Sequence, residues 1–267
     1  MIDLSSASKA LSCLDCIDKV AVDAGDVIME VYQKNIEIRY KLDHSPLTEA
    51  DLESNRTILE ALNEVYPDIP ILTEEGVEDF KGPNTDGYYW LIDPLDGTKE
   101  FIKRNGEFTV NIALIHKGDP ILGVVYAPAK KLMYRAVRGY GAFKREGLGL
   151  PKSIGVTKHT PGTTWKVMGS RSHSDNATSQ WLDALGPYTF IPMGSSLKMC
   201  LIAEGEAHIY PRFGPTSLWD TAAAHAILKE AGGEIKDLDG HVLSYKNPSH
   251  TLNPFFIASS DKDFVKN

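Results

Sequence analysis

Apolar residues recur at intervals of three and four along two long stretches near the start of the chain. This spacing places them on one face of a helix, and it predicts amphipathic helices over residues 7–32 and 48–66. Residues 36–40 instead alternate apolar and polar side chains, as a half-buried strand does. Short apolar runs at about 70–72 and 88–92 predict two further strands.

The middle of the chain is rich in strand-forming residues. Four segments of mainly apolar and β-branched side chains are separated by Gly, Pro, Lys and Asp turns, which predicts an antiparallel meander. These segments are residues 109–115, 121–126, 132–137 and 142–145.

The pattern changes at about residue 150. Residues 165–168 are typical of a strand, and three later segments have helical spacing: 176–185, 196–204 and 218–231. We therefore predict an α+β protein of two halves stacked in layers, residues 1–150 and 151–267, which together form one compact unit. The Gly/Pro-rich stretch 147–162 is the weakest join between them.

Composition and charge narrow the function classes. The chain has 267 residues, 42% of them hydrophobic and 24% charged, which excludes a disordered, collagen-like or coiled-coil protein. Lys and Arg number 28 against 36 Asp and Glu, and this net charge of −8 argues against a nucleic-acid polymer as partner. A small phosphorylated ligand stays open, because it needs no more than a few local cations or a metal.

The lack of a recognisable targeting signal and the few cysteines lead us to expect a cytoplasmic protein. We find no apolar run that predicts a transmembrane helix, and the start of the chain does not read as a secretory signal. The three cysteines do not suit a disulfide framework, and the pair Cys13 and Cys16 lies in a helical pattern, so metal or redox use is disfavoured. Peripheral attachment to the inner face of the membrane stays open, as does the choice between a monomer and a homodimer.

Carboxylates stand at the ends of predicted elements in three segments. Glu74 follows a short strand, Asp93 and Asp96 follow the next one, and Asp220 lies at the start of the last helix. Pro94 predicts a turn that holds Asp93 and Asp96 close together, so that each raises the pKa of the other. A hard divalent cation such as Mg²⁺ relieves that repulsion.

Amides that begin a helix follow these carboxylates directly. Gly97 and Thr98 expose backbone N–H groups at a position that binds anions. A metal beside such amides is the arrangement that phosphoryl chemistry uses.

Each of these segments also has a purely structural explanation. The run from Asp93 to Thr98 makes a good turn followed by a helix N-cap, and Glu74 suits a solvated loop. Asp220 favours the helix dipole, and Thr48 with Asp51 matches a capping box. Spacing along the chain does not join the segments in space.

Taken in order, the acidic segments resemble the signature motifs of the inositol monophosphatase superfamily, a group of Mg²⁺-dependent, lithium-sensitive phosphomonoesterases. The matching segments are Glu74-Glu75, Asp93-Pro94-Leu95-Asp96-Gly97-Thr98 and Trp219-Asp220-Thr221-Ala222-Ala223. The resemblance covers essentially the whole chain. It implies a layered αβαβα sandwich like that of fructose-1,6-bisphosphatase, with the active site where the two halves meet.

The resemblance also implies a set of site residues. Two or three Mg²⁺ ions, with inhibition by Li⁺, would be held by Glu74, Asp93, the carbonyl of Leu95, Asp96 and Asp220. Asp51 and Thr98 match the pair that helps to orient the nucleophilic water, and Glu74 helps to take its proton.

Three further segments resemble the 3′(2′),5′-bisphosphate nucleotidases of that superfamily: 96–115, 194–198 and 210–216. They imply removal of the 3′-phosphate of 3′-phosphoadenosine 5′-phosphate, a by-product of sulfate assimilation. Whether phosphoadenosine phosphosulfate is a second substrate stays open. The implied substrate contacts are Gly97, Thr98, His173, Ser195, Ser196, Lys198 and Arg212.

Two other functions stay open at this point. The first is a broad inositol or sugar phosphatase of the same superfamily. The second is a non-catalytic nucleotide-binding protein, against which the complete acidic set argues.

Overall fold

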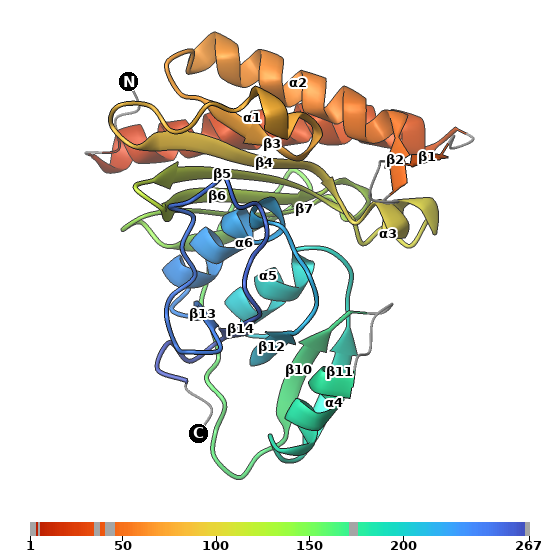
Figure 1. Cartoon of the computed structure of the whole chain (residues 1–267), viewed down its shortest axis with the longest axis vertical. Coiled ribbons are helices and arrows are strands. Elements are labelled where there is room, and N and C mark those ends of the chain that lie inside the picture. Colours follow the sequence, from red (N-terminus) through yellow and green to blue (C-terminus); the bar gives the residue numbers. More distant parts are fainter. Residues whose placement is uncertain (1–3, 5, 35–37, 41–45, 171–175, 265–267) are drawn as a thin grey trace.

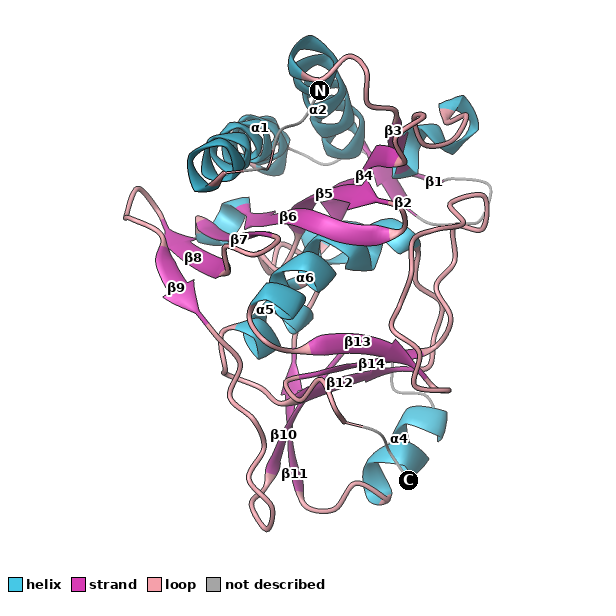
Figure 2. Cartoon of the chain, turned by 90° about the vertical axis from the view of Figure 1, so that its left-hand side faces the viewer, coloured by secondary structure: helices cyan, strands magenta, loops and turns pink. Residues whose placement is uncertain are grey.

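Helices and sheets alternate in five layers, which Figure 2 shows from the side. Helices α1 (Ala7–Tyr32) and α2 (Glu49–Val65) cover the outer face of a seven-stranded sheet. Helices α5 (Leu197–Ala203) and α6 (Leu218–Glu230) lie between this sheet and a five-stranded sheet, and α4 (Asn176–Asp183) lies against the outer face of the latter (Figures 1 and 2). The αβαβα sandwich expected from the sequence is confirmed.

The structure, a computed structural model, describes residues 4, 6–34, 38–40, 46–170 and 176–264. The two long N-terminal helices have the predicted bounds to within one residue. Among the described residues, no helix combines the length and the apolarity needed to traverse a bilayer. The remaining short helical elements are the 3₁₀ turns η1 (Glu74–Asp79) and η2 (Pro128–Lys130) and the helix α3 (Thr98–Ile102).

The first sheet has the strand order β3-β4-β5-β6-β7-β8-β9. Strands β3 and β4 run parallel and all later neighbours are antiparallel, so the predicted meander is confirmed. Strand β9 escapes prediction because its exposed Lys152 and Ser153 carry no hydrophobic pattern. The bounds are β3 (Ile71–Thr73), β4 (Tyr88–Asp96), β5 (Thr109–His116), β6 (Asp119–Ala127), β7 (Leu132–Val137), β8 (Ala142–Glu146) and β9 (Lys152–Ile154).

A separate hairpin pairs β1 (Ile38–Tyr40) with β2 (Pro46–Thr48) beside the start of α2. The division of the chain near residue 150 stays a prediction, and β9, just beyond that point, still pairs with the first sheet.

The second sheet has the mixed order β11-β10-β12-β14-β13. The sequence pattern predicts β10 and misses the other four strands. One of these contains Pro211, a residue that argues against a strand, and another is an edge strand with mostly exposed side chains. The bounds are β10 (Trp165–Gly169), β11 (Tyr188–Pro192), β12 (Ile209–Arg212), β13 (Glu234–Asp237) and β14 (Phe256–Ser259).

Helix α6 joins the two sheets. Ten of its thirteen residues are buried, so it lacks the polar face of a surface helix, as expected between two apolar layers. On the side of the first sheet, a Cβ added at Gly123 of β6 would lie 2.2 Å from the carbonyl oxygen of Ala223. This backbone contact sets the distance of α6, and of Asp220 in its first turn, from the first sheet.

Candidate active site

A cavity of about 190 Å³ lies between the two sheets, at the ends of several elements. Asp96 and Glu100 line it from β4 and α3, and Lys198, Arg212 and Asp220 line it from the second half of the chain. Acidic and basic side chains therefore line the same cavity.

The parallel pair β3 and β4 brings Glu74 and Asp93 to the same edge of the first sheet. Thr73 is in register with Ile92, so Glu74, which follows the end of β3, comes beside Asp93, which is still part of β4. In addition to burial, the nearby carboxylate of Glu74 accordingly helps to raise the pKa of Asp93.

The turn predicted at Pro94 is wrong. Strand β4 continues to Asp96, and its register against β5 shifts between Asp93 and Asp96. In a regular strand, residues three apart point to opposite faces. The irregularity changes that alternation, so that the carboxylates of Asp93 and Asp96 lie close together. The predicted turn was expected to have the same effect.

Three carboxylates converge here. Asp93, Asp96 and Asp220 each offer an oxygen, and these oxygens lie within 4.8 Å of one another. Burial, followed by repulsion from Glu74, Asp96 and Asp220, raises the pKa of Asp93 well above its usual range. Burial and then Asp96 raise the pKa of Asp220 to about 8. Clustered oxygen donors whose charges repel one another fit a hard divalent cation such as Mg²⁺.

Asp51 and Thr98, which come from α2 and α3, are in contact. The Thr98 hydroxyl donates to Asp51 Oδ1 at 3.2 Å. Asp51 Oδ2 accepts hydrogen bonds from the amide and the hydroxyl of Thr48 at 2.7 and 2.6 Å, which completes the capping box of α2. The structural and functional explanations of Asp51 are therefore compatible, because the box fixes the carboxylate that Thr98 contacts.

Side chains from both halves hold Asp96. Its Oδ2 accepts a hydrogen bond from the Ser196 amide at 2.6 Å, and Ser196 Oγ lies 2.7 Å from both this oxygen and the Asp220 carbonyl oxygen. Asn111 of β5 donates to Asp96 Oδ2 at 3.2 Å and to Ser196 Oγ at 2.8 Å. The sequence pattern does not single out Asn111, although a polar residue with apolar neighbours on both sides in a buried strand is a signal that could have found it.

Asp220 is fixed by the helix that it begins. Its Oδ2 accepts a hydrogen bond from the Ser217 amide at 2.8 Å, within the capping box of α6. Asn253 donates to the Ser217 carbonyl at 2.6 Å and so ties a C-terminal loop to the same turn. The sequence carries no motif that marks Asn253.

Lys198 and Arg212 form the basic wall of the cavity. Lys198 Nζ donates to the Ser195 carbonyl at 2.7 Å, lies 5.4 Å from the centre of the Tyr210 ring, and has its pKa lowered chiefly by burial. Arg212 Nη2 donates to the Pro215 carbonyl at 2.8 Å. Its buried Nε has no hydrogen-bond partner within the part of the chain that the structure describes.

Gly97, Ser195 and His173 are the remaining residues predicted to contact the substrate. Gly97 and Ser195 line the cavity, and both have positive φ values, 90° and 48°. At Gly97 this conformation begins α3 and favours glycine. Their contacts to substrate stay predictions. His173 lies outside the described residues, and its predicted contact also stays a prediction.

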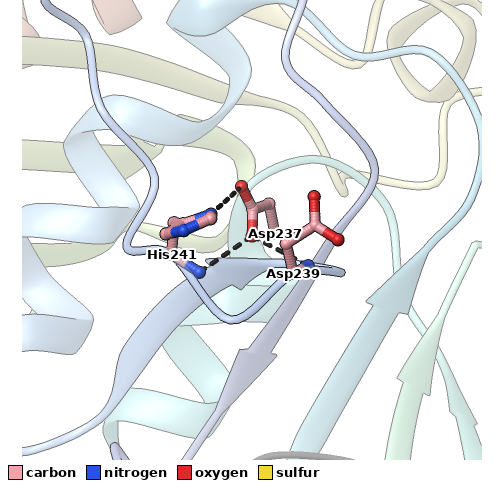
Figure 3. A group of neighbouring side chains, drawn as sticks. All are labelled: Asp237, Asp239 and His241. Atoms are coloured by element: carbon pink, nitrogen blue, oxygen red, sulfur yellow. Dashed lines mark hydrogen bonds and ion pairs between the residues drawn. The ribbon is translucent and has the colours of Figure 1, made fainter.

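A second acidic group, outside the cavity lining, is explained by a turn (Figure 3). Asp237 Oδ1 accepts hydrogen bonds from the amides of Asp239 and His241 at 3.0 and 2.8 Å, and Asp237 Oδ2 lies 3.4 Å from His241 Nδ1. Both oxygens of Asp237 thus close the loop after β13.

Known proteins match the chain over nearly all of its length. The sequence profile of the inositol monophosphatase family matches residues 11–263. The chain is 50% identical over 245 residues to the 3′(2′),5′-bisphosphate nucleotidase CysQ of Salmonella typhimurium strain LT2, which covers 91% of this chain and 98% of that protein. It is 48% identical over 248 residues to the CysQ nucleotidase of Escherichia coli strain K12, with 92% and 99% covered.

A solved structure shares the fold. CysQ from Bacteroides thetaiotaomicron, a bacterial member of the inositol monophosphatase family, is similar with a TM-score of 0.81 at 37% identity. The match covers 98% of this chain and 100% of that chain, so it includes both sheets and the cavity between them. The chain therefore belongs to the inositol monophosphatase family.

Proposed function

We propose that the protein is a Mg²⁺-dependent phosphomonoesterase that converts 3′-phosphoadenosine 5′-phosphate to adenosine 5′-monophosphate. The observation that carries this proposal is one cavity lined both by Asp96 and Asp220 of the carboxylate cluster and by the cations Lys198 and Arg212. A bisphosphate uses both walls, a metal for the phosphate that is cleaved and fixed cations for the one that is kept. The names of the relatives at 48% and 50% identity support the same substrate class.

The acidic wall is the proposed metal site. Two or three Mg²⁺ ions would be held by Glu74, Asp93, the Leu95 carbonyl, Asp96 and Asp220. When bound, Mg²⁺ supplies positive charge that offsets the carboxylate repulsion, polarises the phosphate and makes a water more acidic. Asp93 and Asp220, whose pKa values are raised, release protons when they become ligands. Inhibition by Li⁺ follows from the family resemblance.

Thr98 and Asp51 orient the attacking water. Because the Thr98 hydroxyl donates its hydrogen bond to Asp51 Oδ1, its lone pairs remain to accept a hydrogen bond from the water. Glu74, at the same sheet edge as Asp93, is the second group placed to take a proton. The water attacks phosphorus in line, the 3′-oxygen leaves, and no covalent phosphoenzyme forms.

The basic wall binds the rest of the nucleotide. The amides of Gly97 and Thr98 hold oxygens of the scissile phosphate, and Lys198 and Arg212 hold the 5′-phosphate. A phosphate oxygen would also satisfy the buried Nε of Arg212, which has no hydrogen-bond partner among the described residues. Recycling of a by-product of sulfate assimilation in the cytoplasm is the cellular role that follows from this substrate.

Phosphate release tests the substrate directly. With Mg²⁺ present, kcat/KM for 3′-phosphoadenosine 5′-phosphate should exceed that for inositol 1-phosphate by about 100-fold or more. Inositol 1-phosphate has no second phosphate for Lys198 and Arg212 to bind. Lithium should suppress the reaction. Comparable release from inositol 1-phosphate would keep the metal site but favour the broad-phosphatase alternative, and no release from either would favour a binding protein.

Substitution of Thr98 separates its hydroxyl from its shape. Thr98→Val keeps the size and loses the acceptor, so kcat should fall by about 100-fold or more, whereas Thr98→Ser should stay within about 10-fold of wild type. Mg²⁺ should raise the Tm of both variants as it does in wild type. Wild-type kcat in Thr98→Val would remove this residue from the mechanism.

The raised pKa of Asp220 makes the stability of the metal-free protein depend on pH. This pKa is about 8 in the folded protein and about 3.9 in the unfolded chain, so between these values the folded state binds the extra proton. In EDTA, the free energy of unfolding should fall as pH rises from about 4 to about 8 and level off above that. Saturating Mg²⁺ should restore stability most at the alkaline end.

Urea unfolding over this pH range, in EDTA and in Mg²⁺, provides the measurement. Asp220→Asn is the matched control. Its side-chain oxygen can still accept a hydrogen bond from the Ser217 amide, but the side chain no longer titrates. Its curve in EDTA should be flatter than that of wild type. Equal slopes in the two proteins would rule out Asp220 as the source of the pH dependence.

A further inference from the structure

One carboxylate that lines the cavity has no part in the proposed reaction. Of the described residues that line the cavity, three are acidic: Asp96, Glu100 and Asp220. Asp96 and Asp220 belong to the carboxylate cluster, but Glu100, from the short helix α3 (Figure 1), does not. A half-buried carboxylate that faces a substrate cavity and lies outside the proposed metal site is available as a hydrogen-bond acceptor. Its role therefore depends on which part of the substrate lies beside it.

The Glu100 side chain passes between two glycines that also line the cavity. A Cβ added at Gly194 would lie 2.6 Å from Glu100 Cγ, and a Cβ added at Gly97 would lie 3.3 Å from Glu100 Oε2. The first distance is too short for a real Cβ, so position 194 needs glycine for the side chain to pass there. The second distance places a carboxylate oxygen beside Gly97, whose amide is proposed to hold the scissile phosphate. Glu100 is therefore held next to the place of the reaction.

The charges that act on Glu100 come from both sides of the cavity. Burial raises the pKa of Glu100 and its own backbone amide lowers it; beyond these, Asp96 raises the pKa and Lys198 lowers it. Glu100 is thus within electrostatic reach of a proposed metal ligand and of a cation proposed to bind the 5′-phosphate. The sugar connects the two phosphates of the proposed substrate, so it lies between these same two groups. The Glu100 carboxylate therefore lies beside the sugar.

Hydrogen bonding limits which substituent of the sugar can lie against this carboxylate. In the described part of the chain, the Glu100 carboxylate accepts a hydrogen bond from its own backbone amide, and no side chain donates to it. Further acceptor positions on its two oxygens are therefore open to a ligand. A sugar hydroxyl can donate to such an oxygen, whereas a phosphate group is itself a negatively charged acceptor and is repelled. In 3′-phosphoadenosine 5′-phosphate, the substituent next to the scissile phosphate is the 2′-hydroxyl.

We propose that Glu100 is a specificity-determining residue that accepts a hydrogen bond from the sugar hydroxyl next to the scissile phosphate. This inference rests on the proposed function and makes the enzyme selective for ribose over 2′-deoxyribose. A site built to bind a hydroxyl rejects the analogue that lacks it, because the acceptor then loses water without gaining a partner. Both phosphates are present in either sugar, so the carboxylate cluster and the basic wall do not contribute to this selectivity.

The test compares two substrates that differ in one hydroxyl, 3′-phosphoadenosine 5′-phosphate and its 2′-deoxy analogue. In wild type, kcat/KM for the ribose compound should exceed that for the deoxy compound by about 10-fold or more, as expected when a hydrogen bond to a charged group is lost. Glu100→Met is similar in length but offers only a weak acceptor, so it should reduce this ratio to about twofold or less. Glu100→Gln is the matched control that keeps a neutral oxygen acceptor, and its ratio should lie between the other two.

The outcomes separate this inference from the proposed function. A wild-type protein that releases no phosphate from 3′-phosphoadenosine 5′-phosphate overturns both. An active wild type that does not distinguish the two sugars, or a Glu100→Met variant that keeps the wild-type ratio, overturns the role of Glu100 alone. Partial misfolding of a variant does not affect the result, because both substrates are measured with the same preparation and the folded fraction cancels in the ratio. If Glu100→Met has no measurable turnover, a wild-type ratio in Glu100→Gln contradicts the inference.

Discussion

Mutual repulsion among the carboxylates clustered around buried Asp93 is the interaction on which the rest of this structure depends. Asp93, Asp96 and Asp220 lie within ligand distance of one another, and burial alone already disfavours the charged forms of Asp93 and Asp220. Packing that serves stability alone would not gather such groups, because each adds to the cost of ionising the others. Protonation or a divalent cation removes that cost. The carboxylate cluster therefore destabilises the fold when no metal is bound, and a bound divalent cation would stabilise it.

The sandwich delivers these carboxylates from separate elements to one point. The parallel edge of β3 and β4 supplies Glu74 and Asp93, the irregular end of β4 supplies Asp96, and α6, wedged between the sheets, supplies Asp220. Ser196 links the two halves, since its hydroxyl lies 2.7 Å from both the Asp96 carboxylate and the Asp220 carbonyl. The cavity lining comes from two separate parts of the chain, residues 96–100 and residues 170–256. Lys198 and Arg212, from the later part, therefore lie close to the carboxylates.

The sequence predicts those parts of the molecule whose signal is local. The long amphipathic helices and the meander carry regular spacing, and the structure has them where expected. The acidic motifs are identified by their family resemblance, and the turn expected at Pro94 is instead a continuation of β4. The second sheet lacks such a signal, because β11 is an exposed edge, β12 contains Pro211, and β13 and β14 have four residues each. Asn111 escapes prediction for another reason: the contact that matters joins it to Ser196, 85 residues away in the chain.

The most direct test of this account compares how Mg²⁺ changes the stability of wild type and of Asp93→Asn. Stability is measured by urea unfolding at about pH 8, because the carboxylates must be ionised to bind the metal. The variant removes one charge from the centre of the cluster and keeps an oxygen that can accept the Leu95 amide. We predict that in EDTA the variant is at least as stable as wild type. Mg²⁺ at about 100 times its Kd should stabilise wild type by about 2.7 kcal/mol and the variant far less. A variant that is less stable without metal, yet gains as much from Mg²⁺ as wild type, would contradict the central place of the carboxylate cluster.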